Sequence, residues 1–208
     1  MKKFGVFILA VLAGIAIGFG GIVFLSCESK YVGAFFFSIG LFMVLTMGLN
    51  LFTGKVCYLF DNPPSYILTL ITIWFGNLVG AGGLGYLVRA TRLTAVVEKA
   101  STVCATKLGD GLVSVFLLAI LCNIMIYVGV DGFKNNQHEI GKYIAIFLCI
   151  FVFVYCGFEH CVANMFYFSL GNVWSGKAIL YLVVMTLGNT VGGIIFPLLK
   201  KAAAKLQQ

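Results

Sequence analysis

Charged residues are scarce in this sequence, since Asp, Glu, Lys and Arg together make up only 10% of its 208 residues. Hydrophobic residues make up 61%, and the mean hydropathy is +1.05, which excludes an ordinary soluble domain. A membrane-spanning helix needs about 20 apolar residues, and the chain contains five or six such stretches. They leave no room for a soluble catalytic or nucleotide-binding module. We therefore predict one all-α, polytopic membrane domain over residues 1–208.

Three further absences narrow the class of protein. Only three prolines are present (Pro63, Pro64 and Pro197), so the two Asn-Pro-Ala boxes of aquaporin-type solute channels are missing. No basic run alternates with stacking aromatic residues, which excludes nucleic-acid binding. The seven cysteines form no Cys-x-x-Cys pair, and buried free cysteine usually packs as a small hydrophobe. We expect neither a metal nor a cofactor.

The first apolar stretch, residues 4–25, follows two lysines as a signal peptide would. It exceeds the usual length of a signal core and lacks a small-x-small cleavage site, so we interpret it as a retained span. The other expected spans cover residues 31–49, 66–88, 108–130, 143–157 and 177–199. Residues 89–107 form the longest predicted polar connection, and residues 131–142 form a second loop.

Polar residues interrupt two of these spans, at residues 48–57 and 157–166. Non-helical backbone at membrane depth is tolerated only where it is buried in protein or lines a cavity, so both interruptions predict broken helices. The second one carries Glu159, His160, Cys161 and Asn164, and titratable groups at this depth usually mark function. The alternatives are ordinary helix ends at the lipid headgroups, with Glu159 and His160 in contact with water and Lys55 snorkelling.

Two patterns recur along the chain at nearly the same spacing. Gly76-Asn77-x-Val79-Gly80 is repeated as Gly188-Asn189-x-Val191-Gly192, and the break at Gly48 is repeated at Gly157. The near-equal offsets predict a duplicated unit of three spans, residues 1–95 and 96–208. Because three is odd, the second copy enters the membrane inverted, as in channels and transporters with a site near the midplane. Chance similarity between Gly-rich spans is the alternative.

The formal net charge of +7 comes from Lys and Arg at the edges of the spans. Such residues contact lipid headgroups and bias orientation. The difference in the number of Lys and Arg residues between the two sides of the membrane is slight here. We predict a multi-pass protein of the cell membrane, and the basic residues near both ends of the chain favour cytoplasmic termini.

The sequence of residues 157–166, Gly-Phe-Glu-His-Cys-Val-Ala-Asn-Met-Phe, resembles the signature of the formate–nitrite transporter family. Leu51-Phe52-Thr53 in the first break is similar to that family's loop in the second helix. The resemblance covers nearly the whole chain. It implies an aquaporin-like bundle of six spans with broken second and fifth helices, assembled as a homopentamer with one pore in each protomer. It also implies a channel for formate, nitrite or hydrosulfide, and no enzyme activity.

The resemblance further assigns residues to the pore. His160 becomes the central histidine with Thr53 across the pore, and Glu159 and Asn164 orient that centre. Lys107 resembles a vestibule lysine that attracts anions, and Asn123 and Asn189 fall at polar pore positions. Two apolar constrictions are expected on either side of the centre, formed by Phe37, Leu41 and Phe153 and by Leu51, Phe52 and Ile126.

A small monovalent anion and a proton are the partners that this arrangement favours. A charge crossing an apolar ring loses hydration at a cost of at least several kcal/mol, whereas a weak acid protonated by His160, or by water in its field, crosses as a neutral molecule. Electrogenic anion passage past a cationic His160 is the variant. Formate or nitrite is the default substrate, with hydrosulfide, acetate and lactate as alternatives.

Other classes of protein fit less well. Cys161 adjoins His160, so on a helix the two side chains point about 100° apart, which is poor geometry for a thiol enzyme. A neutral-solute channel lacks its proline boxes, and a purely structural membrane protein leaves the polar breaks unexplained.

Overall fold

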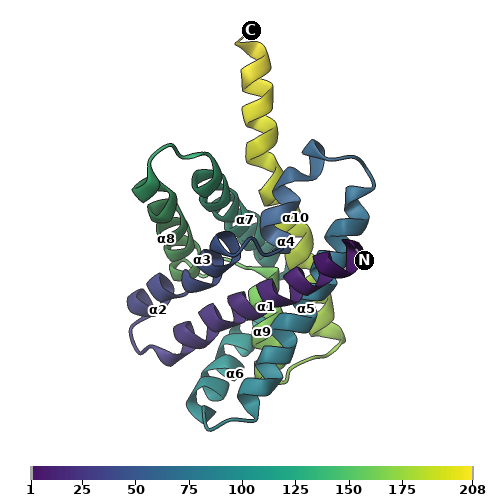
Figure 1. The fold of residues 1–208 in the computed structure, drawn as a ribbon. Helices are drawn as coiled ribbons and strands as arrows, with labels where there is room; N and C mark the ends of the chain where they lie inside the picture. Colours follow the sequence, from purple (N-terminus) through teal and green to yellow (C-terminus); the bar gives the residue numbers. More distant parts are fainter. Residues whose placement is uncertain (1, 208) are drawn as a thin grey trace.

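The computed structural model of the chain describes residues 2–207, so Met1 and Gln208, the ends of the predicted domain, lie outside it. The described part is entirely helical apart from turns and short extended segments (Figure 1). Four helices are long and apolar enough to cross a membrane: α1 (Lys2–Ser26), α5 (Tyr66–Arg89), α7 (Leu112–Asn135) and α10 (Gly176–Leu206). The predicted all-α, multi-pass class is confirmed.

The long helices form two close pairs, in which α1 packs along α5 and α7 packs along α10. Glycines allow the close approach. A Cβ on Gly80 of α5 would lie 1.9 Å from the carbonyl oxygen of Val11, and a Cβ on Gly192 of α10 would lie 2.1 Å from that of Ile120. Small residues of this kind let helix backbones meet where no water is available to drive association.

The predicted break in the second span is present. The span begins as α2 (Lys30–Phe36) and α3 (Ile39–Thr46). The helical conformation ends before Gly48, whose φ of 66° is the left-handed conformation that glycine adopts at low cost. An extended segment follows before the short helix α4 (Phe52–Lys55) and the 3₁₀ helix η1 (Val56–Asp61).

The second break has the same form. Helix α8 (Glu139–Tyr155) ends before Gly157, which has a φ of 75°, and α9 begins at Cys161 and continues to Gly171. The helix therefore resumes within the predicted interruption, and only residues 156–160 are non-helical. All side chains of α9 from Cys161 to Leu170 are buried, so this half-helix lies inside the protein.

Two predicted connections are largely helical. Most of residues 89–107 belongs to α6 (Thr94–Gly109), because Val96, Ala100 and Cys104, spaced four apart, form an apolar stripe that packs on α9. Low hydropathy concealed that periodicity. The loop predicted at residues 131–142 shortens to residues 136–138, since α7 ends at Asn135 and α8 starts at Glu139.

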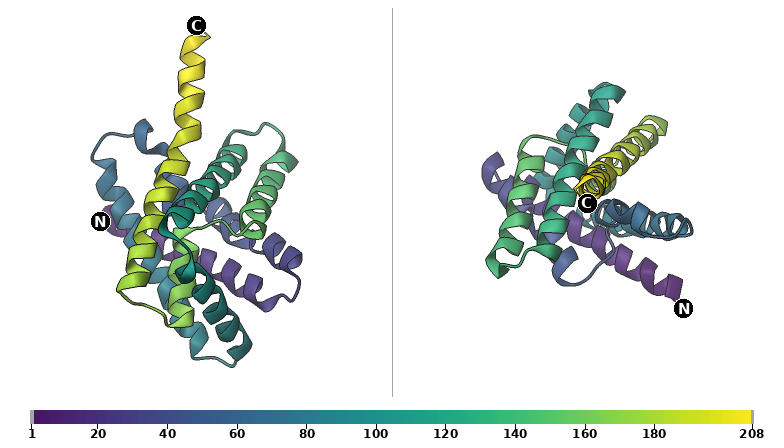
Figure 2. Two further views of the ribbon diagram at one scale, coloured as in Figure 1. Left: turned by 180° about the vertical axis from the view of Figure 1, so that it is seen from behind. Right: turned by 90° about the horizontal axis from the view of Figure 1, so that it is seen from above.

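The C-terminal turns of α10 extend beyond the other helices, at the end of the molecule opposite to α6 (Figures 1 and 2). Lys200 in these turns pairs with Asp131 of α7 at 2.8 Å, and Lys201 pairs with Asp61 at the end of η1. These ion pairs place the C-terminal end of α7 and the end of η1 on the same side as the C-terminus.

Candidate functional site

Two buried asparagines hold the two breaks in place. Asn189 of α10 accepts a hydrogen bond from the backbone N–H of Cys161 at 2.8 Å and donates to the carbonyl oxygens of Glu159 and Ala119, each at 2.8 Å. Both polar atoms of its side chain are therefore used by backbone groups of the second break and of α7. Unpaired backbone groups are costly at this depth, so the asparagine stabilises a non-helical segment that lipid would otherwise exclude.

Asn77 of α5 does the same for the first break. It accepts from the N–H of Phe52 at 2.8 Å and donates to the carbonyl oxygens of Asn50 and Ala10, at 2.9 and 2.7 Å. All three partners precede the matching partners of Asn189 by one and the same offset along the chain. The backbone N–H of Asn50 also bonds to the carbonyl oxygen of Leu9, as that of Glu159 bonds to Leu118. The two halves thus repeat one hydrogen-bond pattern.

His160 is the last residue of the second break and caps the N-terminus of α9. Its Nδ1 accepts a hydrogen bond from the backbone N–H of Ala163 at 3.1 Å, and its Nε2 lies 2.9 Å from Oγ1 of Thr53. A ring nitrogen that accepts an N–H carries no proton, so the neutral ring carries its proton on Nε2 and donates it to Thr53. The ring is 2% exposed and stacks on Phe153, with centroids 5.8 Å apart.

Glu159 is also buried. One side chain neutralises the charge of its carboxylate, and a second donates a hydrogen bond to it. Nζ of Lys107, from α6, lies 2.6 Å from Oε2, and Nδ2 of Asn164 donates to the same oxygen at 2.8 Å. Asn164 Nδ2 also lies 3.0 Å from the carbonyl oxygen of His160. The predicted vestibule lysine is therefore paired with an acid. The buried Oδ1 of Asn164 has no hydrogen-bond partner among the described residues.

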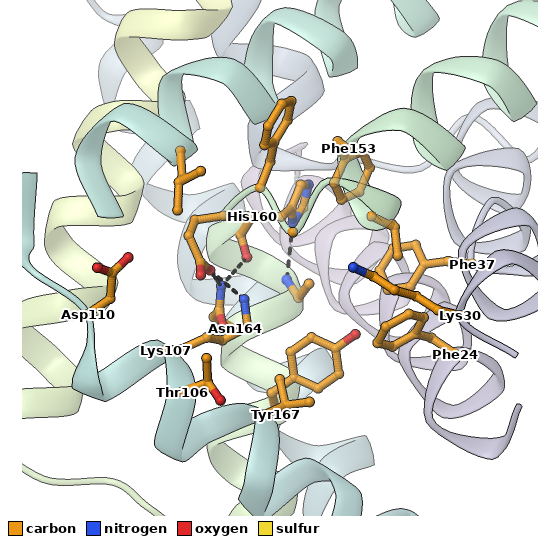
Figure 3. Close-up of a pocket in the computed structure, with 17 residues that line it drawn as sticks. Phe24, Lys30, Phe37, Thr106, Lys107, Asp110, Phe153, His160, Asn164 and Tyr167 are labelled. Carbon is orange, nitrogen blue, oxygen red and sulfur yellow. Dashed lines mark hydrogen bonds and ion pairs between the residues drawn. The ribbon is translucent and has the colours of Figure 1, made fainter. Parts of the chain in front are cut away.

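A cavity of about 350 Å³ adjoins this group on the side of α6; we call it the α6 vestibule (Figure 3). His160, Asn164 and Lys107 line it together with Lys30 and Asp110. Phe37 and Phe153, two predicted constriction residues, also line it and meet edge to face, with centroids 5.8 Å apart.

A second cavity, of about 230 Å³, lies on the other side of the breaks, between α3, α4 and the C-terminal end of α7; we call it the α7 vestibule. Leu41 and Leu51 line it with Lys55 and Lys134. The prediction grouped Leu41 with Phe37 and Phe153 instead, and the structure places it on the side of Leu51 because it lies one turn beyond Phe37. Phe37 lines the α6 vestibule and Leu41 the α7 vestibule, although they are four residues apart on one kinked helix. At this helix the residues that line the two cavities are therefore about one turn apart.

The remaining predicted pore residues line neither vestibule. Phe52 faces an apolar groove between α5 and α10, where Trp74 donates a hydrogen bond to Thr186. Ile126 and Asn123 are buried in α7, and Asn123 donates to the carbonyl oxygen of Thr53 at 3.1 Å, while its Oδ1 has no partner among the described residues. Asn189 holds backbone, as described above.

The sequence reasoning missed three lysines that line the cavities: Lys30, Lys55 and Lys134. Lys55 carried a signal, since it lies within the first break. Lys30 and Lys134 lie in predicted connections between spans, where lysine is common. The sequence alone does not show that these two side chains face a cavity.

Broken helices that meet between two vestibules define a membrane protein of the channel or transporter class. The match to known proteins is more specific: the family model described as formate/nitrite transporter fits residues 1–202, and the chain belongs to that family.

The relatives agree with this assignment. The chain is 33% identical to a probable formate transporter of Methanothermobacter thermautotrophicus, covering 92% of this chain and 85% of the relative. It is 31% identical to the formate channel FocA of Haemophilus influenzae, covering 80% and 71%. The solved structure of a pentameric formate channel with formate bound superposes with a TM-score of 0.86 at 25% identity, covering 99% of this chain and 98% of that one.

Proposed function

We propose that this chain is a channel for small monovalent anions of weak acids, with formate or nitrite as the first candidates. The observation that carries the proposal is the pair of lysine-bearing vestibules on either side of the breaks. Phe37 lines one and Leu41, about one helical turn further along, lines the other, and His160 lines the first. The names of the relatives, formate transporter, formate channel and nitrite transporter, support the same substrate class.

The apolar layer between the vestibules argues for passage as a neutral acid. Phe37 and Phe153 on one side and Leu41 and Leu51 on the other offer no polar atoms to replace water around an anion. Dehydrating a charge costs at least several kcal/mol even after relaxation, and protonation of the anion removes most of that cost. Phe52 and Ile126 line neither vestibule, so this layer does not depend on them.

The hydrogen bonds of His160 favour water as the source of the proton. An imidazolium would carry a proton on Nδ1, directed at the N–H of Ala163, so charging the ring breaks the cap of α9. The neutral ring keeps that cap. When the hydrogen bond between His160 Nε2 and Thr53 breaks, Nε2 can donate its proton in a hydrogen bond to a bound anion instead. The free Oδ1 of Asn164 then offers an acceptor for the acid's O–H.

A flux assay tests this function. Proteoliposomes are loaded against a panel of labelled formate, nitrite, hydrosulfide, acetate and lactate at two external pH values, with glycerol as the neutral control. We expect uptake of at least one weak acid to rise as external pH falls, because the protonated fraction rises. Uptake that does not change with pH contradicts neutral-acid passage, and a steady current in formate without a proton gradient supports the electrogenic variant. Flux of glycerol alone places the chain among neutral-solute channels.

The assembly belongs to the same proposal. A pentameric formate channel is similar over the whole chain, and the groove between α5 and α10 exposes Phe75, Val79 and Leu187, which favours burial against lipid or a second copy. We expect a homopentamer with one pore in each protomer. Native mass spectrometry from mild detergent measures this directly, and a monomer that retains flux rules out a required pentamer.

A further inference from the structure

The two vestibules differ in net charge. Two cations, Lys30 and Lys107, line the α6 vestibule, and two anions, Asp110 and Glu159, line it as well, so its formal charges cancel. The closest of these groups form the 2.6 Å ion pair between Lys107 and Glu159. The α7 vestibule is lined by Lys55 and Lys134 and by no acidic residue of the described chain, which gives it a formal charge of +2.

Two acids on this side of the molecule are paired with other lysines. Asp131, one turn before Lys134, binds Lys200 at 2.8 Å, and Asp61 binds Lys201. Within residues 2–207, neither Lys55 nor Lys134 takes part in an ion pair. The ammonium group of Lys134 instead lies 4.0 Å from the ring centroid of Tyr58, a cation–π contact that places the charge without neutralising it.

The shape of the cavity limits what these two charges can bind. Its other walls are apolar and consist chiefly of Leu41, Leu49, Leu51 and Phe133. These side chains provide no cation or hydrogen-bond donor for the additional charges of a multivalent anion. Its volume of about 230 Å³ holds a small anion with several waters, since a water occupies about 30 Å³ of liquid. Lys55 belongs to α4, the same short helix as Thr53, which bonds to His160, so an anion held here lies close to the central residues.

We propose that Lys55 and Lys134 form a binding site for a small, singly charged anion in the α7 vestibule, and that this site makes the channel's affinity for its substrate higher from that side. The site stands on geometry and charge alone, whereas its part in transport rests on the function proposed above. Because the C-terminus lies on the same side, the site faces the cytoplasm in the predicted topology.

Bromide, a singly charged anion that scatters anomalously, tests the site directly. Crystals of the full chain grown over a series of bromide concentrations are compared with crystals of K55Q, K134Q and the control K205Q. Lys205 lies in the exposed end of α10, so K205Q makes the same charge change at the same end of the molecule, outside the cavity. We expect an anomalous peak between Lys55 and Lys134 that saturates with bromide, persists in K205Q and disappears in both other variants. The absence of a peak in the native chain, or its persistence in both cavity variants, overturns the site.

Flux measured from each side tests its role. Right-side-out and inside-out vesicles from the same cells give the formate concentration for half-maximal flux in each direction. We expect the K55Q/K134Q double variant to raise that concentration about tenfold from the cytoplasmic side, the lower end of what charge focusing gives in a cleft. From the other side, and in K205Q, it should stay unchanged, and K55R/K134R should restore it.

The outcomes separate the two proposals. Equal effects from both sides, or none, contradict the asymmetry while leaving the channel function intact. If the native chain conducts no formate from either side, the proposed function fails, and the bromide crystals still decide whether the anion site exists.

Discussion

His160 shows how one side chain can be both a structural cap and a central polar group. Its two ring nitrogens are both engaged, one by the N–H of Ala163 and the other by Thr53. The residue at the matching place in the first break, directly before Phe52, is Leu51. The two breaks therefore share a backbone form, and only one of them presents an imidazole.

Replacing His160 by Asn separates these two tasks. An Asn side chain can accept the N–H of Ala163 and keep the cap, whereas Ala cannot, and loss of an N-cap costs about 1 kcal/mol. We expect H160N to keep the thermal unfolding midpoint of the native protein in detergent and H160A to lower it. If water supplies the proton, H160N also keeps formate flux that rises as pH falls. Complete loss of that flux in a folded H160N protein would instead make the imidazole the proton donor.

The pair between Lys107 and Glu159 predicts non-additive effects on stability. Glu159 is 4% exposed, so removing Lys107 leaves a buried carboxylate held only by Asn164. Breaking a buried pair from one side costs about 3–5 kcal/mol, whereas removing both charges costs much less. We expect K107M to lower the free energy of unfolding in detergent far more than K107M/E159Q does. Additive losses across this double-mutant cycle would show that the two groups do not interact.

At the level of elements, glycine allows the helix to break locally, and hydrogen bonds from residues far away in the sequence hold each broken segment in place. Gly48 and Gly157 both adopt positive φ, and the sequence pattern predicted a break at each of them. The recurring Gly-Asn motif pointed to Asn77 and Asn189, and the structure adds what each asparagine binds, namely the backbone of its own half's break. Because those partners lie 25 to 70 residues away, no local pattern could reveal them.

The glycines of the long helices test the close packing that supports the breaks. A Cβ on Gly192 would meet the carbonyl oxygen of Ile120 at 2.1 Å, so G192A must push α10 and α7 apart. Gly83 of α5 has nothing within 4 Å of its Cβ position and serves as a matched control. We expect G192A to lower the unfolding midpoint and the yield of folded protein, and G83A to leave both unchanged. Equal behaviour of the two variants would mean that the helices tolerate separation.

At the scale of the whole molecule, the repeated contacts support the duplication predicted from sequence. The backbone groups that are hydrogen-bonded at the two breaks match at one constant offset along the chain, and the α1–α5 pair corresponds to the α7–α10 pair. Inverted three-span repeats over residues 1–95 and 96–208 remain a prediction, and they require the N- and C-termini to lie on the same side of the membrane.

Topology reporters test that requirement. Fusions of a reporter that is active only in the cytoplasm, placed at the N-terminus, at the C-terminus and in the loop of residues 90–93, should be active at both termini and silent in the loop. An active loop fusion combined with active termini would contradict the odd number of spans in each half.

The sequence by itself determined that this chain lies in the membrane, that two of its helices are interrupted and which residues the interruptions carry. Hydropathy and the backbone freedom of glycine are local properties, so local patterns are sufficient to read them. Only the tertiary structure decided that Lys107 is neutralised by Glu159, and that one vestibule is uncharged overall while the other is cationic. Charge cancellation depends on the distance between side chains that the chain brings together from far apart, and that distance is set by packing.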